Sequence, residues 1–129
     1  MLEESLLIYK KHLPENHIVV AGILVYLGAV YKDLGTYEKA KDFIEQGLLI
    51  YKKHFPQDHN EIAWALAHLG DTYRAIGHLE EAKSLLEKSL IIYKKHFPET
   101  HSEVIWASNC LRNICHALGE HEEANLLGK

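Results

Sequence analysis

The hydrophobic positions of this chain recur with the period of an α-helix. Between about residues 17 and 34 they are spaced three or four apart (Val20, Leu24, Leu27, Tyr31, Leu34), which places them on one helical face. A second helical run begins near Tyr37 and ends near His54 (Ala40, Phe43, Ile44, Gly47, Leu48, Tyr51). Gly35 follows the first run, where a left-handed cap favours glycine, and Pro56 ends the second. The pattern predicts a helical hairpin.

The hairpin pattern is repeated along the chain. The segment Ile8 to Pro14 returns at Ile50 to Pro56 and again at Ile92 to Pro98, with a spacing of 42 residues each time. The same register relates three further groups: His17, His59 and His101; Leu27, Leu69 and Leu111; Gly35, Gly77 and Gly119. A fixed period of this size is the signature of a repeat architecture in which each unit packs against its neighbours.

The repeat register predicts a single all-α solenoid of stacked antiparallel hairpins with about seven helices. We expect the second helix of a partial repeat at 1–13, complete repeats at 14–55 and 56–97, and a truncated repeat at 98–129. The first helix would present its apolar residues without a preceding partner (Leu2, Leu6, Leu7, Tyr9). The chain is therefore expected to be a fragment or a minimal solenoid whose ends self-associate.

Helix termini carry the charges and polar groups that suit them. Acidic residues lead the second helices, as Glu38 does, and Lys-Lys-His ends them, which complements the helix dipole. The side-chain oxygens of Asn16, Asp58 and Thr100 precede the first helices and are the expected N-caps.

Composition and charge narrow the class of protein. The 129 residues are 47% hydrophobic and 25% charged with a formal net charge of −4, which is ordinary for a folded protein and gives no nucleic-acid footprint. No apolar run is long enough for a membrane span. Two cysteines, Cys110 and Cys115, do not make a disulfide scaffold. Reduced, buried thiols would fit a cytoplasmic protein.

The motif residues resemble the tetratricopeptide repeat. In the first hairpin Leu27-Gly28, Tyr31, Leu34-Gly35, Tyr37 and Ala40 match its pattern, and Leu69-Gly70, Tyr73, Gly77 and Ala82 match it in the second. The period of 42, longer than the usual 34 or so, with Pro-x-x-His between hairpins, is similar to the kinesin-light-chain-type subgroup. The third copy departs, with Arg112 for the glycine and Cys115 for the tyrosine. The resemblance implies a right-handed superhelix, close helix approach at the glycines, and a wider gap or missing partner at Arg112.

The resemblance also implies binding along a concave surface lined by the first helix of each hairpin. Trp64 and Trp106 are equivalent positions and either anchor a partner or pack as core between helices; core packing is the more common role of a large apolar side chain. The candidate groove positions are Val25, Ala29, Lys32, Trp64, Ala67, His68, Asp71, Arg74, Trp106, Asn109, Asn113 and His116.

Lys32, Arg74 and His116 form an aligned column that would either attract an acidic segment or remain a solvated face. The carboxylate clamp of chaperone-binding relatives is not supported, because its positions lack the required Lys, Asn or Arg (Val25, Ala29, His68, Trp106, Cys110).

No catalytic, cofactor or metal constellation is visible. His12 and His17 lie five residues apart around a proline, not at the spacing that pairs two ligands on a helix. The recurring histidines are instead expected to cap helices or pack between hairpins.

The preferred function is therefore a non-enzymatic scaffold that binds a protein or peptide in a preformed groove. The alternatives are a self-assembling solenoid that associates end to end and a regulatory module attached to a catalytic domain elsewhere.

Overall fold

The computed structural model describes residues 17–119, and within this range the chain forms five α-helices and no strand. The helices agree with the hydrophobic pattern to within about a residue at most ends. Their bounds are α2 Ile18–Asp33, α3 Tyr37–His54, α4 Asn60–Ile76, α5 Leu79–His96 and α6 Ser102–Ala117. The all-α prediction is confirmed. The expected helices at 1–13 and after residue 119, with the apolar residues Leu2, Leu6, Leu7 and Tyr9, lie outside the described residues.

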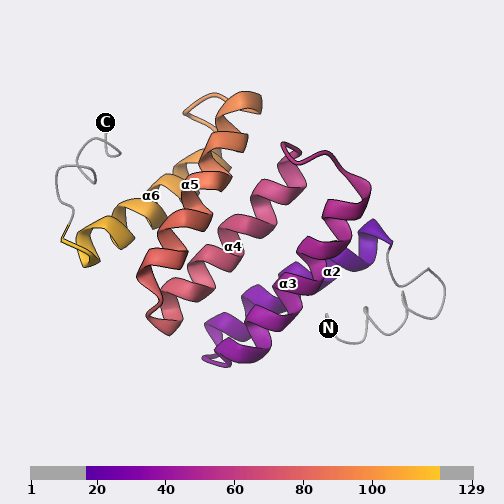
Figure 1. Ribbon diagram of the computed structural model, residues 1–129, viewed down its shortest axis with the longest axis horizontal. Helices are drawn as coiled ribbons and strands as arrows, with labels where there is room; N and C mark the ends of the chain where they lie inside the picture. Colours follow the sequence, from indigo (N-terminus) through magenta and orange to yellow (C-terminus); the bar gives the residue numbers. More distant parts are fainter. Residues whose placement is uncertain (1–16, 120–129) are drawn as a thin grey trace.

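The helices stack as hairpins in chain order. α2 packs on α3 and α4 packs on α5, while α3 and α5 each also contact the first helix of the next unit. α2 contacts α4, and α4 contacts α6, so first helices adjoin one another. Figure 1 looks onto α3 and α5, with α4 between them. We call the surface formed by α2, α4 and α6 the first-helix face, and the surface formed by α3 and α5 the second-helix face.

Glycines allow the two helices of each hairpin to approach closely, as expected from the repeat motif. A Cβ added at Gly28 would lie 2.9 Å from the carbonyl oxygen of Ala40, and one at Gly70 would lie 3.2 Å from that of Ala82. Arg112 occupies the equivalent position on α6, where its guanidinium contacts Asn109. The segment that would face Arg112 lies outside the described residues.

The N-caps of the first helices are the recurring histidines, not the residues before them. The Nδ1 atom of His17 accepts from the amide of Val19 at 3.0 Å, and His59 and His101 repeat this contact at 3.0 and 3.2 Å. The expectation that Asp58 and Thr100 would cap these helices was wrong; Asn16 lies outside the described residues. A histidine fits here because its ring also packs: the ring of His59 stacks on Phe55 with centroids 3.8 Å apart. The capping alternative for the histidines is confirmed.

The helix C-termini follow the glycine pattern. Gly35, Gly77 and Gly119 have positive φ angles of 85°, 103° and 82°, a conformation that glycine adopts at little cost. Acids stand in the first turns of α3 and α5, and Lys-Lys-His in their last turns, as expected. The core runs continuously through both hairpins and α6. Three residues of α2 form a small separate cluster (Val20, Leu24, Leu27). Within residues 17–119 no helix is both long and apolar enough to cross a membrane.

Candidate functional site

A row of aromatic rings crosses the first-helix face. Tyr26 of α2 meets Trp64 of α4 edge to face at 4.8 Å between centroids. Trp64 meets His68 at 5.4 Å, and His68 meets Trp106 of α6 at 4.9 Å. Tyr26 at the start of this row is 57% exposed. The row therefore links three successive first helices and presents aromatic surface to solvent at Tyr26.

Trp64 and Trp106 take the core role that the sequence left open, but neither is fully buried. Both side chains are partly buried and pack against the hydrophobic core. Trp64 also lines a pocket that opens between the first helices. Each tryptophan therefore stabilises the stack and stays partly exposed.

Two of the candidate groove positions belong to the core instead. Val25 and Ala67 are 0% exposed, and the Cγ2 of Val25 lies against Gly47 of α3. These residues point toward the second helix of their own hairpin, so they cannot touch a ligand. Val25 and Ala67 are 42 residues apart and so share one repeat position, which the close packing of α2 on α3 at Gly47 buries in the first hairpin.

Among the remaining positions Asp71 is also buried, at 4% exposed, and the others are partly buried or exposed on the first-helix face. Ala29 is partly buried on α2, whereas Asn109, Asn113 and His116 are exposed on α6. They are accessible side chains that extend beyond the aromatic row.

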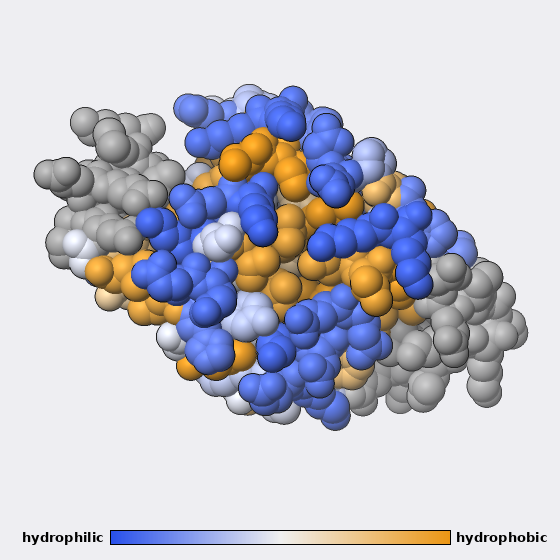
Figure 2. Space-filling model, viewed as in Figure 1, coloured by the Kyte–Doolittle hydropathy of each residue, from blue (hydrophilic) through white to orange (hydrophobic). Residues whose placement is uncertain are grey.

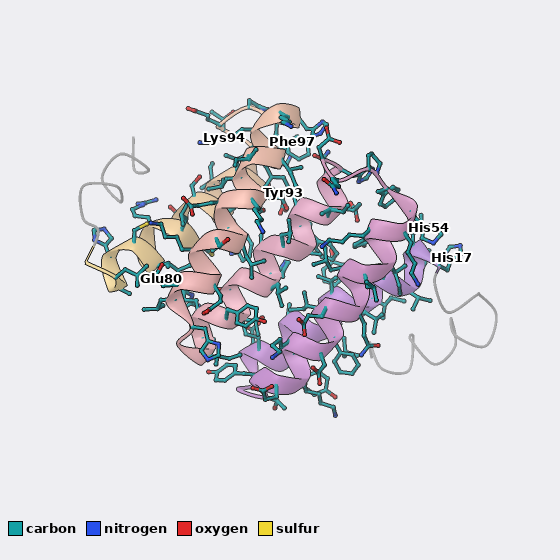
Figure 3. The ribbon with its side chains drawn as sticks, in the orientation of Figure 1. His17, His54, Glu80, Tyr93, Lys94 and Phe97 are labelled. Atoms are coloured by element: carbon teal, nitrogen blue, oxygen red, sulfur yellow. The ribbon has the colours of Figure 1, made fainter. Side chains whose placement is uncertain are left out.

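The pocket between the first helices has a volume of about 340 Å³. We call it the first-helix pocket; its lining residues are Gly22, Tyr26, Tyr51, Asn60, Glu61, Trp64, Tyr93, Phe97 and Glu103. Tyr93 and Phe97 come from the C-terminal part of α5 (Figure 3). Gly22 leaves room for the Tyr51 hydroxyl, which would lie 3.1 Å from a Cβ at that position.

Two tyrosine–glutamate pairs stand in this pocket, 42 residues apart in the sequence. The hydroxyl of Tyr93 donates to Oε2 of Glu103 at 3.4 Å. Burial, followed by the charge of the facing glutamate, raises the pKa of Tyr93 above its ordinary value. The pKa of Tyr51 is raised in the same way by burial and by Glu61. Both tyrosines are therefore neutral donors, each facing a carboxylate.

The basic column predicted from sequence is largely engaged within the protein. Asp71 of α4 is 4% exposed; it accepts from Nζ of Lys32 on α2 and, at 2.9 Å, from Nε of Arg74. Burial lowers the pKa of Lys32, but the hydrogen bond and charge of Asp71 outweigh it and raise that pKa. Burial likewise raises the pKa of Asp71, and its two partners pull it below the ordinary value. Lys32 also lies 3.1 Å from Asp33, so this network, which ties α2 to α4, holds two cations and two carboxylates.

His68 stands between the two tryptophans as a neutral ring. Desolvation lowers its pKa to about 4, while the charge of Asp71 raises that pKa and the charge of Lys32 lowers it by smaller amounts. The imidazole therefore carries no charge at neutral pH, which suits its place in an aromatic row.

Both cysteines are free and buried, as expected. Burial raises the pKa of the Cys110 thiol to about 11, so this sulfur is protonated at neutral pH. A protonated, buried thiol is a structural group and not a nucleophile.

The second-helix face holds a larger groove that the hydrophobic pattern did not predict. It has a volume of about 860 Å³. Its floor comes from α4 (Ile62, Leu66, Leu69, Tyr73), and its walls come from α3 and α5. Figure 2 shows this apolar strip between hydrophilic margins. The groove exists because α3 and α5 stand apart from each other. The hydrophobic periodicity of a single helix does not predict that distance.

These features define a class of protein: a solenoid of helical hairpins with an aromatic first-helix face. A family model for the tetratricopeptide repeat matches residues 19–95, and the chain belongs to that family. Such repeats are generally non-enzymatic scaffolds for protein interaction. The long period and the structural matches below place the chain among the kinesin-light-chain-like repeats.

Solved structures support the assignment. A crystal structure of a Podospora anserina protein assigned as a kinesin light chain, with nearly identical TPR-like repeats, superposes with a TM-score of 0.72 at 26% identity. A single-substitution variant of that protein gives 0.75 at 26%. BtubC (BKLC) from P. vanneervenii gives 0.86 at 20% identity and shares the fold. All three cover 98% of this chain, which spans 59% of the variant, 60% of its parent and 50% of BtubC. No curated protein matches the chain.

Proposed function

We propose that this chain binds an extended segment of another protein along its first-helix face, which is the concave face of the solenoid. The observation that carries the proposal is the aromatic row from Tyr26 through Trp64 and His68 to Trp106, whose ring contacts cross three helices. Aromatic side chains dominate binding hot spots because they bury large areas with few rotatable bonds.

The rigidity of the face supports the proposal. The His68 ring is held between two tryptophans, and Asp71 ties the neighbouring first helices together. A receptor whose side chains are already ordered loses little conformational entropy on binding. The segment alone then bears the ordering cost.

Peptide selection followed by variants on the two faces tests the proposal. Peptides would be selected on the wild-type chain from a displayed random library and measured by fluorescence polarisation. Tyr26→Ala removes an exposed ring from the first-helix face; Ile91→Ala removes a 61% exposed side chain at the rim of the second-helix groove. Loss of a hot-spot ring is expected to weaken binding about tenfold or more, with no change for Ile91→Ala.

The opposite result would assign peptide binding to the second-helix face. If selected peptides lose affinity with Ile91→Ala and keep it with Tyr26→Ala, the second-helix groove is the binding surface and the proposal is wrong. End-to-end association rests on residues outside those described. Molar mass by light scattering across a concentration range tests it separately.

A further inference from the structure

We propose that the first-helix pocket receives a basic side chain, arginine in preference to lysine, from the segment bound on this face. The proposal rests on the proposed function and names the chemistry by which the segment is recognised. It is carried by the polar groups, the aromatic walls and the size of the pocket.

The polar groups of the pocket favour a cation. Of the described residues that line it, two are carboxylates, Glu61 and Glu103, and none is Lys, Arg or His. Each carboxylate faces a tyrosine hydroxyl, yet a carboxylate has about four acceptor sites, so most of them stay available. The pocket is therefore negative and rich in acceptors.

The walls of the pocket are aromatic. Tyr26 and Trp64 meet edge to face at 4.8 Å, and Tyr51 lies 6.5 Å from Trp64 between ring centroids. A cation over such faces gains cation–π attraction, most strongly over tryptophan. A planar guanidinium also stacks on a ring while its five N–H groups reach separate acceptors, which an ammonium cannot do.

Other side chains fit less well. An acidic side chain would be repelled by Glu61 and Glu103. An apolar one would fill the volume of about 340 Å³ but leave both carboxylates desolvated without donors, which is unfavourable. A cation is the occupant that can pair with both carboxylates and also contact the aromatic walls.

Titration with small probes, followed by NMR, tests the proposal. The chain has two tryptophans, so an ¹H–¹⁵N spectrum contains two indole signals, and Trp64 lines the pocket while Trp106 does not. N-acetyl-arginine amide should shift the Trp64 signal saturably and more than the Trp106 signal. N-acetyl-citrulline amide, its neutral isostere, should bind about tenfold more weakly.

Matched variants separate recognition from folding. Glu61→Gln with Glu103→Gln removes the two carboxylates from the first turns of α4 and α6. The control, Glu38→Gln with Glu80→Gln, removes the same charge from the first turns of α3 and α5. Equal thermal stability would show equal folding. The pocket variant should lose about tenfold in arginine-amide affinity, and the control should keep it.

Equal shifts from arginine and citrulline amides, unchanged arginine binding by the pocket variant, or no Trp64 shift would each overturn the proposal. If Trp64 does not shift while selected peptides still lose affinity with Tyr26→Ala, only the arginine assignment fails and the peptide-binding function stands. If selected peptides lose affinity with neither Tyr26→Ala nor Trp64→Ala, the proposed function fails first.

Discussion

The buried hydroxyl of Ser89 on α5 donates a 2.7 Å hydrogen bond to the carbonyl oxygen of Ala63 on α4. One repeat earlier, Gly47 stands in the place of the serine. A Cβ added there would lie 2.8 Å from the carbonyl oxygen of Ala21 and 2.7 Å from Cγ2 of Val25. The two helices therefore pack closely at this position in both hairpins, but with different residues. The second hairpin has room for Ser89 because it has Ala67 where the first has Val25.

This relationship predicts a coupling between two positions of the first hairpin. Gly47→Ser alone forces the new side chain against Val25 and should destabilise the fold by about 1–3 kcal/mol, the usual cost of overpacking. Combining it with Val25→Ala reproduces the second hairpin. The double variant should be about 1 kcal/mol more stable than the sum of the single effects. Urea unfolding of all four proteins measures the coupling, and strict additivity would contradict it.

The N-cap role of His59 predicts different losses from different replacements. His59→Phe keeps a ring on Phe55 but removes the acceptor for the Glu61 amide; it should cost about 1 kcal/mol of stability. His59→Asn keeps a capping side chain and loses the stack, again at about 1 kcal/mol. His59→Ala loses both. Chemical denaturation ranks the three, and full stability of His59→Phe would show that the cap contributes nothing.

The neutral His68 ring predicts a pH dependence of stability. Its pKa falls from 6.5 in the unfolded chain to about 4 in the fold, so the unfolded state binds the proton first. Stability is therefore unaffected above pH 6.5 and falls as the pH drops toward 4, by at most about 3 kcal/mol. His68→Gln should flatten the unfolding free energy between these pH values, measured by urea titration. The exposed control His54→Gln should retain the wild-type slope.

The ion network predicts an asymmetry among its members. Asp71→Asn leaves Lys32 and Arg74 without their shared carboxylate and should destabilise the fold by about 2 kcal/mol, somewhat less than a fully buried pair, because Arg74 is partly exposed. Lys32→Met removes one cation but leaves Arg74 on the aspartate, so its cost should be smaller. Thermal unfolding compares the two, and a larger loss for Lys32→Met would show that the aspartate is not the centre of the network.

The helices could be predicted from sequence because each boundary is marked by local chemistry. Gly35 and Pro56 end their helices in ways that depend on a few neighbouring residues only. Capping was one of two roles expected for the recurring histidines, but Asp58 and Thr100 beside them were named as the N-caps, because oxygen side chains are the common caps. The fitness of histidine as a cap depends on a ring stacked across the preceding loop, as Phe55 is on His59.

The candidate site was predicted less completely, because it depends on distances between helices. Trp64 was among the predicted groove positions and Tyr26 was not, because the contact between them joins different repeats. The pairing of Lys32 with Asp71 needed the spacing of α2 from α4. Val25 was misplaced because one step along a helix separates a groove position from a core position.

The network of Lys32, Asp71 and Arg74 also has a mechanical consequence. It joins α2 to α4 on the first-helix face, whereas the second-helix groove separates α3 from α5 on the opposite face. Breaking the network would therefore let adjacent hairpins tilt relative to each other. Since the carboxylate is buried, ions in solution screen it only weakly. The pitch of the stack should therefore hold steady from dilute buffer to concentrated salt. Under the proposed function, a partner would meet a surface of nearly constant shape, so the shape of the partner would contribute to its selection.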